Sequence, residues 1–460
     1  MIGLGTMGRN FLLNIAEHGI SGVGFDLDAG KRDLLLKEGA GMPVDVGNDM
    51  ADFIAKLETP RNIMMLVPAG PIVDAVITDL LPHLEKDDLI IDGGNSHFTD
   101  TERREADLAA KGVGFMGVGV SGGEEGARHG ASIMPGGRRD FYDRVEATLQ
   151  AVSAKVNGEP CVAYMGASSA GHFVKMVHNG IEYGLMQILS ETYDFMQRVL
   201  KMDCAAMAQA FADWNDSELN SFLVEITAEV LRKSDPDTGN PLVSMILDTA
   251  GQKGTGKWTS QAAMDFGIPI PTIDSAVSMR QISSQKATRE TIAGKYAAPA
   301  TGNATKASLD DLKKALLCSF IATYAQGLSL LQAASKEKNY GLDLAECAKI
   351  WRGGCIIRSA LLEEMRVAYS KDVSLANLLL DDKFAAILGE NTASWRAVIS
   401  AFTLDGVPSL CFSSALNYAE AFRTVRLPAN LIQAQRDFFG AHTYQRIDRE
   451  GTFHTPDWDV

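Results

Sequence analysis

A stripe of polar side chains interrupts an otherwise apolar segment near the middle of the chain. In residues 171–183, GHFVKMVHNGIEY, the polar positions are Lys175, His178, Asn179, Glu182 and Tyr183. At 3.6 residues per turn these positions share one face of a helix. Because the other faces are apolar, the helix is expected to be buried. Its stripe must then line a cavity or satisfy itself internally.

The Lys and Glu of this stripe could supply a base and an acid, because burial moves the pKa of both groups towards neutrality. A buried pair with a purely structural role is the alternative. A second segment, residues 314–328, echoes the first but has Leu317, Cys318 and Ile321 near the His, Asn and Glu positions. Since such a helix can be built without the stripe, the comparison favours chemistry.

A glycine-rich loop carries two further cations. Residues 250–259, AGQKGTGKWT, contain Lys253 and Lys257 and nearly match a triphosphate-binding loop. The match fails because Trp258 stands where Ser or Thr must bind magnesium, and because residues 242–250 are expected to form a helix instead of a strand. The loop suits a phosphate or a carboxylate, with a solvated basic turn as the alternative.

Three more candidate ligands are isolated in the sequence. Arg280 lies on an amphipathic helical segment, and Arg436 and His442 lie in a stretch near the end of the chain. Taken singly, each would more often form a surface ion pair than bind a ligand.

The first residues predict a dinucleotide site. Gly3-Leu-Gly5-Thr-Met-Gly8 is a G-x-G-x-x-G turn between a strand and a helix, which brings a pyrophosphate to the helix N-terminus. A purely structural glycine turn is the alternative. An acidic residue, Asp26, ends the second strand about 20 residues further on, as such sites require. The expected cofactor contacts are Gly3, Gly5, Thr6, Met7, Gly8, Asp26, Val67 and Asn95.

Asp26 bears on the choice between NAD and NADP. A carboxylate there accepts a hydrogen bond from a ribose 2′-hydroxyl but repels a 2′-phosphate. No Arg is adjacent, although Lys31 and Arg32 could still reach a phosphate. The pattern favours NAD and leaves NADP open.

The elements that must position these residues follow from hydrophobic periodicity. Strands are expected at residues 1–4, 22–27, 62–67, 88–92 and 113–116, with weaker signals at 132–134 and 162–165. Helical patterns such as 10–18 and 102–111 alternate with them, which predicts a parallel, doubly wound α/β sheet.

From about residue 171 helical patterns dominate, with a Gly/Pro/Ala-rich break at 294–303. Trp214 and Trp351 follow the two related segments at similar distances, which suggests two related helical units. We therefore expect a Rossmann-like dinucleotide-binding domain at 1–170 and an all-α substrate and dimerisation domain at 171–426. A C-terminal tail would follow at 427–460.

Composition limits the function classes. A chain of 460 residues exceeds what one core supports, and a net charge of −15 argues against a nucleic-acid or anionic-membrane partner. An anionic substrate therefore needs a local cationic cluster. Six scattered cysteines fit reduced, buried thiols in a cytosolic protein, and neither a membrane span nor a signal peptide is expected.

Five motifs, in the same order and spread over the whole chain, resemble the 6-phosphogluconate dehydrogenases. They are IDGGNS at 91–96, VSGGEEGA at 120–127, the segment 171–183, GQKGTGKW at 251–258 and LIQAQRDFFGAHTY at 431–444. The resemblance implies oxidative decarboxylation of 6-phospho-D-gluconate to D-ribulose 5-phosphate in the pentose phosphate pathway, with NAD or NADP as oxidant and without a metal.

The resemblance also implies residue roles. Lys175 would be the general base at the 3-hydroxyl, and Glu182 the acid that protonates the product carbon. The residues implied to hold the sugar acid are Asn95, Ser121, Gly122, Gly123, His178 and Asn179. Those implied to hold the phosphate are Tyr183, Lys253, Arg280 and Arg436, with His442 close by. The family is a homodimer whose tail reaches the partner's site, which would explain ligands in the tail.

Three departures from the family pattern are visible. Many members have Asn-Arg-Thr where this chain has Asp26-Leu27-Asp28, so the usual NADP preference is in question. Pro68 stands where many members have Lys, and the chain starts two residues before Gly3, which predicts a short first strand.

Two other functions are considered. Another β-hydroxyacid dehydrogenase, such as one acting on 3-hydroxyisobutyrate, would be shorter and would need no phosphate site. A binding or structural protein without turnover would not need the Lys175/Glu182 pair.

Overall fold

The computed structural model describes residues 1–296 and 307–458. The chain forms two compact units, Met1–Ala415 and Leu416–Val460. Most of the break expected at 294–303 lies outside the described residues, from residue 297 onward.

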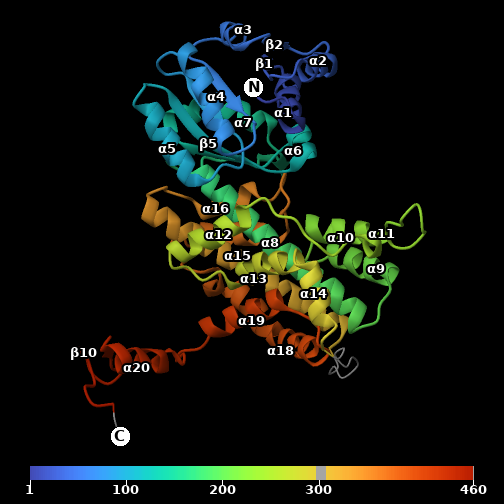
Figure 1. Ribbon diagram of the computed structural model, residues 1–460, viewed down its shortest axis with the longest axis vertical. Helices are drawn as coiled ribbons and strands as arrows, with labels where there is room; N and C mark the ends of the chain where they lie inside the picture. Colours follow the sequence, from blue (N-terminus) through green and yellow to red (C-terminus); the bar gives the residue numbers. More distant parts are fainter. Residues whose placement is uncertain (297–306, 459–460) are drawn as a thin grey trace. The chain divides into compact units, whose positions relative to one another are not determined.

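The first unit begins with an α/β domain built on a mixed sheet (Figure 1). Its four central strands, in spatial order, are β3 (Asn62–Met65), β4 (Leu89–Asp92), β5 (Gly114–Val120) and β6 (Ile133–Gly137). Strands β1 (Gly22–Gly24) and β2 (Val44–Val46) form a separate parallel pair. Single bridges from Ile2 to Phe25 and to Met65 join the two sheets.

Two predictions about the sheet need correction. The sheet is not wholly parallel: β6 runs antiparallel to β5, because the connection through the short helix α6 (Gly123–His129) returns the chain to the end where β5 stops, with Ile133 paired beside Val120. The strand expected at 1–4 is reduced to the bridges of Ile2, since Gly3, with φ of 88°, ends the extended conformation there. Strand β2 was not predicted, and residues 162–166 contribute only isolated bridges.

Helices cover both faces of the sheet. They are α1 (Thr6–Glu17), α2 (Ala29–Glu38), α3 (Met50–Ala55), α4 (Pro71–Leu80), η1 (Leu81–His83), α5 (Phe98–Ala109), α6 (Gly123–His129) and α7 (Arg139–Val152). Successive residues of β4 belong to different apolar clusters: Leu89 and Ile91 pack in one, and Ile90 packs in the other. This alternation shows that both faces of β4 are buried.

A short antiparallel pair, β7 (Lys155–Val156) and β8 (Glu159–Pro160), leads into a helical region. Its elements are α8 (Ala170–Arg198), α9 (Cys204–Asn215), α10 (Phe222–Arg232), α11 (Leu242–Met245), α12 (Thr255–Asp265), α13 (Pro271–Ser283), α14 (Lys286–Ala293), α15 (Leu309–Lys338), α16 (Leu344–Ile350), α17 (Leu361–Lys371), η2 (Leu378–Leu380), α18 (Asp382–Leu404) and α19 (Leu410–Phe422).

Two long helices form the centre of this region. α8 has 29 residues and α15 has 30, and they pack against each other, with α18 on α15. α15 is long and apolar enough to cross a membrane, with a mean hydropathy of 1.3 over its most apolar window, but 89% of that window is buried inside the protein. The protein itself therefore covers this apolar surface.

The second unit, Leu416–Val460, contains α20 (Ala429–Gly440) and an antiparallel pair, β9 (Tyr444–Gln445) and β10 (Thr452–Phe453). The buried carboxylate of Asp437 organises it by accepting hydrogen bonds. The donors are the backbone N–H groups of Thr443 and Thr455, and the rings of His454 and Trp458. A polar centre thus holds α20 and the residues that follow it together.

Candidate active site

Glycines in the sheet let α8 pack directly on strand backbones. A Cβ added at Gly119 of β5 would overlap the Cβ of Lys175, and one at Gly117 would lie 2.7 Å from Nδ1 of His172. A Cβ at Gly136 of β6 would overlap the backbone of Gly171. The first turns of α8, including Lys175, are therefore fixed against β5 and β6 by close approach.

The prediction that this helix is buried is confirmed. Its apolar positions Phe173, Val174, Met176, Val177 and Ile181 are at most 3% exposed. In the polar stripe, Lys175 is 7% exposed, His178 is fully buried and Tyr183 is 6% exposed. Asn179 and Glu182 are half-buried.

Lys175 and Glu182 have pKa values displaced in opposite directions. Burial lowers the pKa of Lys175 to about 8, although the charge of Glu182 raises it in part. Burial raises the pKa of Glu182, against the charges of Lys175 and Arg280. Within the described residues, no hydrogen bond or ion pair engages the Lys175 ammonium. A buried amine without a partner beside a half-buried carboxyl can act as base and acid.

Ser121, His178 and Asn179 form a neutral polar group beside Lys175. The Nδ1 atom of His178 lies 3.1 Å from Oδ1 of Asn179, and Nε2 lies 3.5 Å from the Ser121 hydroxyl. Burial and the nearby Lys175 lower the pKa of His178 well below its ordinary value. The ring is therefore neutral, and with Nδ1 donating to the Asn179 amide oxygen, Nε2 is left as an acceptor.

The loop from Ser121 requires glycine. Gly122 has φ of 103°, and a Cβ there would lie 2.6 Å from the carbonyl oxygen of Gly354. Gly123 begins α6, with φ of 60°. The backbone of these residues therefore approaches the site without side chains.

Arg280 of α13 covers the far end of the stripe. Its guanidinium carbon lies 3.9 Å from the centroid of the Tyr183 ring, and Nη1 donates to the carbonyl oxygen of Gly251, 2.8 Å away. A Cβ at Gly256 would lie 2.5 Å from the Tyr183 ring, so the loop and the start of α12 pack on Tyr183. Lys253 is exposed in this loop. Tyr183, Lys253 and Arg280 thus belong to one cationic corner.

The prediction of a helix at 242–250 is wrong beyond Met245, where α11 ends. The following residues are held instead by ion pairs of Asp248 with Lys286 and Arg289, at 2.7 and 2.8 Å. Long-range pairing of this kind overrides local helix propensity.

The dinucleotide loop has three differently used glycines. A Cβ at Gly3 would lie 2.6 Å from the carbonyl oxygen of Leu66, and one at Gly8 would overlap the carbonyl of Gly3. Nothing lies within 4 Å of a Cβ at Gly5, the N-cap of α1. Internal packing explains why residues 3 and 8 are glycine, but it does not explain the glycine at position 5. The open space beside Gly5 fits the close approach of a pyrophosphate.

Asp26 is held at the end of β1. Its Oδ2 accepts from Leu4 N–H at 2.8 Å and its Oδ1 from Asp28 N–H at 3.0 Å. Lys31 Nζ lies 3.4 Å from Oδ2. Burial raises the pKa of Asp26, but these hydrogen bonds and Lys31 outweigh it and lower the pKa. The carboxylate is therefore ionised at neutral pH.

The remaining cofactor candidates end neighbouring strands. Val67 follows β3 and is half-buried, and Asn95 follows β4 and is exposed. Since β3 and β4 are parallel, these loops lie at the same edge of the sheet. Thr6 and Met7 begin α1.

The structure brings the site residues of the first unit together on α8 and around it. Arg436 and His442 lie instead in the second unit, Leu416–Val460. There Arg436 donates to Gln433 at 3.1 Å, and the His442 ring lies 6.0 Å from the Phe439 ring.

Sequence reasoning did not single out three buried residues close to this site: Asp92, Arg104 and His172. Asp92 and His172 lie inside motifs that carried the resemblance, so their positions were visible but not their contacts. Arg104 had no signal, because it reads as one more charge on an amphipathic helix.

Among residues 1–296 and 307–458, no group of three or more His, Cys, Asp or Glu side chains could hold a metal ion. The six cysteines are free, five of them buried and Cys204 half-buried.

Comparisons with known proteins cover both parts of the chain. Residues 1–166 match the NAD binding domain of 6-phosphogluconate dehydrogenase, and residues 171–458 match the 6-phosphogluconate dehydrogenase C-terminal domain. The NADP(+)-dependent, decarboxylating 6-phosphogluconate dehydrogenase of Bacillus subtilis (strain 168) is 50% identical over 99% of this chain and 98% of its own length. The decarboxylating enzyme of Rattus norvegicus is 47% identical over 100% of this chain and 96% of its own.

A solved structure agrees with this result. The 6-phosphogluconate dehydrogenase of Plasmodium falciparum, described in its apo form and in complex with NADP+ and with 6-phosphogluconate, has a TM-score of 0.96 and 42% identity. The match covers 99% of both chains.

Proposed function

Because the chain belongs to the 6-phosphogluconate dehydrogenase family, we infer that it oxidatively decarboxylates 6-phospho-D-gluconate to D-ribulose 5-phosphate and carbon dioxide. The observation that carries this function is the buried, unpartnered Lys175 beside Glu182, in a chain that matches decarboxylating relatives along its whole length. A shorter β-hydroxyacid dehydrogenase would leave the cationic corner at Arg280 without a purpose.

Lys175 starts the reaction. With a pKa of about 8, a useful fraction of its amine is neutral near pH 7 and can take the proton of the substrate 3-hydroxyl. The bound nicotinamide dinucleotide supplies the acceptor for the hydride that leaves C3. The resulting ammonium of Lys175 then returns this proton to the C3 ketone oxygen as carbon dioxide leaves, which gives an enediol.

Glu182 completes the reaction. Its raised pKa keeps more of the carboxyl protonated than water would, so it can protonate the carbon that lost the carboxyl group. Ser121, His178 and Asn179 would donate to or accept from the sugar-acid hydroxyls. Asn95 and the backbone of Gly122 and Gly123 would complete that part of the site.

The phosphate would bind at the cationic corner of Tyr183, Lys253 and Arg280. Arg280 is half-buried, and its guanidinium is already oriented by the Tyr183 ring and by Gly251, while the neighbouring loop supplies Lys253. This local positive charge acts against the overall charge of −15.

The cofactor is a nicotinamide dinucleotide, and NAD is proposed to be preferred. Asp26 is ionised and presents its carboxylate at the end of β1, where it would accept from a ribose 2′-hydroxyl and repel a 2′-phosphate. The Bacillus subtilis relative is NADP(+)-dependent, so this chain would differ from it. The ratio of kcat/KM for NAD and NADP with 6-phosphogluconate tests the proposal, and a strong NADP preference contradicts it.

A homodimer with exchanged tails is also proposed. The unit Leu416–Val460 exposes large apolar side chains, namely Phe422, Val425, Leu427, Leu431, Ile432, Phe438, Phe439 and Ile447. Exposed apolar side chains in this number support the proposal of an interface between two copies of the chain. Arg436 and His442 lie in the same unit and would reach the partner's phosphate site. A cytosolic location is proposed as well, since the six cysteines form no disulfide.

Replacing the base tests the mechanism. We expect Lys175→Ala to abolish NAD(P)H production from 6-phosphogluconate while the melting temperature and circular dichroism stay close to wild type. Lys314→Ala, in the related helix α15, removes a lysine paired with Asp310 and serves as the control with normal activity. A fully active Lys175→Ala enzyme contradicts the mechanism. Oxidation of 3-hydroxyisobutyrate in preference to 6-phosphogluconate contradicts the substrate.

A further inference from the structure

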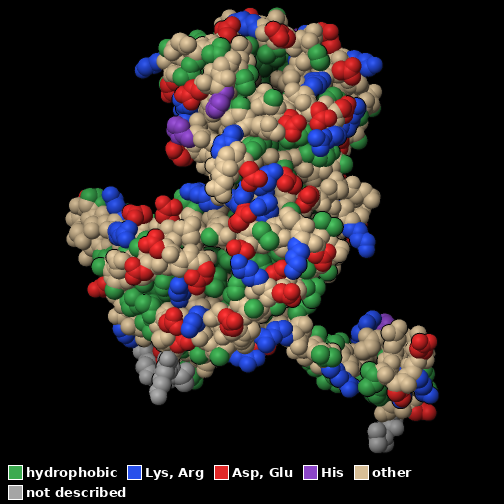
Figure 2. Space-filling view, turned by 180° about the vertical axis from the view of Figure 1, so that it is seen from behind, with side chains coloured by type: hydrophobic (Ala, Val, Ile, Leu, Met, Phe, Trp, Pro, Cys, Tyr) green, Lys and Arg blue, Asp and Glu red, His purple; other side chains and the backbone are tan. Residues whose placement is uncertain are grey.

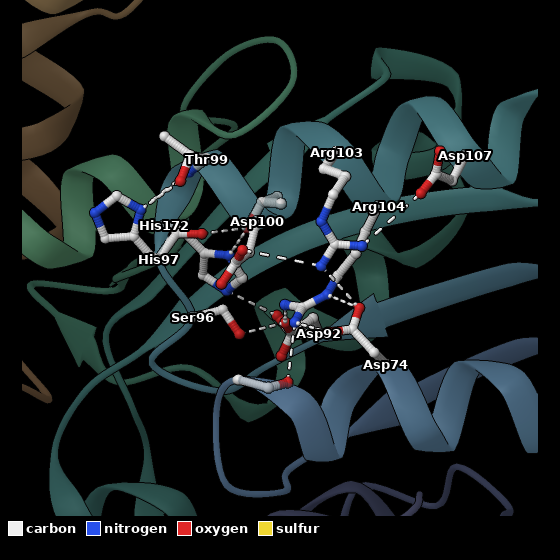
Figure 3. Close-up of polar contacts among 12 residues, drawn as sticks. Asp74, Asp92, Ser96, His97, Thr99, Asp100, Arg103, Arg104, Asp107 and His172 are labelled. Carbon is white, nitrogen blue, oxygen red and sulfur yellow. Dashed lines mark hydrogen bonds and ion pairs between the residues drawn. The ribbon is translucent and has the colours of Figure 1, made fainter.

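A buried polar cluster joins α4, the end of β4 with its following loop, α5 and α8 beside the proposed site (Figure 3). Its members are Asp74, Asp92, Ser96, Thr101, Arg104 and His172. All except Asp74 are at most 4% exposed. None of them has a part in the proton transfers or in the substrate contacts described above.

Asp92, the last residue of β4, holds the loop that presents Asn95. Its Oδ1 accepts from Gly94 N–H at 3.0 Å, and its Oδ2 accepts from the Ser96 hydroxyl at 2.6 Å. These two residues flank Asn95 on either side. The carboxylate therefore fixes the backbone from which Asn95 reaches towards cofactor and substrate.

His172 connects this strand end to the helix that carries the base. Its Nε2 lies 3.0 Å from the carbonyl oxygen of Asp92, and its Nδ1 lies 2.6 Å from the hydroxyl of Thr101. A carbonyl only accepts, so Nε2 carries the hydrogen, and Nδ1 of the neutral ring accepts from Thr101. Burial lowers the pKa of His172, which favours this neutral form. His172 precedes Lys175 by one helical turn on α8.

Arg104 connects the same cluster to the loop after β3. Its Nε and Nη2 bind the two oxygens of Asp74 at 2.9 Å each, and Nη2 also donates to the carbonyl oxygen of Gly70 at 3.0 Å. Gly70 is the N-cap of α4 and ends the loop that begins with Val67. The buried Nη1 has no hydrogen bond and lies 3.7 Å from Oδ2 of Asp92.

We propose that Arg104 and His172, acting through Asp92, are positioning residues that hold the Val67 loop, the Asn95 loop and the base-bearing helix α8 in one register. The proposal rests on the function inferred above. Hydride transfer needs donor, acceptor and base in one geometry, and a displacement of about 1 Å costs about 100-fold in rate. Two of the three elements would contact the cofactor, and the third carries Lys175.

The burial of these charges favours a positioning role over a purely stabilising one. Taking Arg104 and Asp92 out of water is costly, and apolar side chains of similar volume often stabilise a fold as well or better. The cluster instead provides directional hydrogen bonds that link the two loops and α8. Directional hydrogen bonds fix the distances between the elements they join, and hydride transfer requires such fixed distances.

A pair of arginines gives a matched experiment. Arg103 and Arg104 both bind Asp74, but Arg103 is half-exposed and has no bond to Gly70 or Asp92. Single-turnover NAD(P)H formation would be followed for Arg104→Met and Arg103→Met at saturating substrate and cofactor. We expect about 10- to 100-fold slower transfer for Arg104→Met and a near-normal rate for Arg103→Met. With substrate deuterated at C3, the isotope effect should rise for Arg104→Met only.

A second pair of variants covers the case in which Arg104→Met does not fold. His172→Gln keeps an N–H near the position of Nε2 and can still donate to Asp92, whereas His172→Leu removes both bonds. We expect His172→Leu to slow transfer and raise the isotope effect, and His172→Gln to recover most of the rate. A purely structural role would lower the melting temperature without changing the isotope effect.

Two results overturn the proposal: folded Arg104→Met or His172→Leu enzymes that transfer hydride at the wild-type rate with an unchanged isotope effect, or equal losses for Arg103→Met and Arg104→Met. Failure of the proposed function is distinguishable, because wild-type protein would then not oxidise 6-phosphogluconate at all.

Discussion

At the scale of single residues, the chemistry proposed for this site depends on the shifted pKa values of two side chains. Lys175 and Glu182 sit two helical turns apart on α8, and burial lowers the pKa of the amine and raises that of the carboxyl. In the proposed mechanism, the productive state has a neutral Lys175 amine and a protonated Glu182 carboxyl. Of the two protons that Lys175 and Glu182 can bind together, one must therefore be present and one absent.

This requirement predicts the pH dependence of kcat/KM. Below the raised pKa of Glu182 both groups are protonated, and above the pKa of Lys175, about 8, neither is. A bell-shaped profile with a basic limb near pH 8 follows. The basic limb is the diagnostic one, because the substrate phosphate also titrates, near pH 6.

Glu182→Gln should show a profile with a single titration for hydride transfer, the step that comes before protonation by Glu182. Transfer then needs only a neutral Lys175, so the rate rises with pH and reaches a plateau. The midpoint should lie below pH 8, because the charge of Glu182, which raises the pKa of Lys175, is gone. Single-turnover measurements across pH test this. A descending basic limb that persists in Glu182→Gln contradicts the assignment.

The charge of Asp26 predicts how a variant at this position changes the choice between NAD and NADP. We expect Asp26→Asn to raise kcat/KM for NADP relative to NAD by about 10-fold or more, because one charge repelling the 2′-phosphate is removed. The control is Asp33→Asn, which removes one negative charge from the exposed side of α2. It should change the NADP-to-NAD ratio of kcat/KM much less. Equal shifts for the two variants would show that only the overall charge matters.

Sequence reasoning reached the residues whose pattern is local and missed those whose meaning is tertiary. The stripe on α8 has helical spacing, so its shared face and its burial could be predicted. Arg104 and His172 could not, because their partners Asp74 and Asp92 lie in other segments of the chain.

At the level of elements, the close packing of α8 on the sheet gives the site its rigidity. β5 is fully buried over Gly114–Val120, and its glycines leave room for the backbone and first side chains of α8. The sequence signal for β5 ended at residue 116, because glycines weaken a strand pattern. Those same glycines are explained only by the helix above them.

Gly119→Ala tests this packing. The new methyl group would overlap the Cβ of Lys175, and overpacking of this kind costs about 1–3 kcal/mol. We expect lower stability in urea unfolding and a kcat reduced about 10-fold or more, as Lys175 is displaced. Gly389→Ala in the exposed part of α18 meets nothing within 4 Å and should stabilise by up to about 1 kcal/mol with normal kcat. Normal kcat in Gly119→Ala would show that the helix position is not critical.

Element prediction failed where tertiary contacts decided the outcome. Alternation of strands and helices in the first third was sufficient to predict the α/β class. The antiparallel direction of β6 depends on where the connection through α6 returns the chain beside β5, and the early end of α11 depends on ion pairs of Asp248 with α14. Neither is encoded in local periodicity.

For the whole molecule, net charge and site charge have opposite signs. On the face shown in Figure 2, Lys and Arg side chains are interspersed with Asp and Glu and form no continuous basic surface. The proposed phosphate site therefore depends on a few individual cations, of which Arg280 and Lys253 are in the first unit and Arg436 is in the second. The second unit is built around Asp437, directly next to Arg436.

The assignment of Arg436 to the partner's site can be tested with mixed dimers. One chain carries Lys175→Ala and the other Arg436→Ala, with different affinity tags, and the two are coexpressed and purified in tandem. Each parental homodimer should be nearly inactive, because every site lacks either the base or the phosphate ligand. If tails are exchanged, the intact Lys175 of the second chain meets the intact Arg436 of the first. The mixed dimer should then recover about half of the wild-type activity, since one of two symmetric sites is complete.

If each tail instead served its own subunit, both sites of the mixed dimer would remain defective, and its activity would equal that of the parents. A chain carrying both substitutions, paired with wild type, gives the control. With exchanged tails, its one intact Lys175 meets the Arg436→Ala tail, so this pair should stay inactive. The two pairings contain the same substitutions in different arrangement, so any difference in activity reports tail exchange and not the loss of residues.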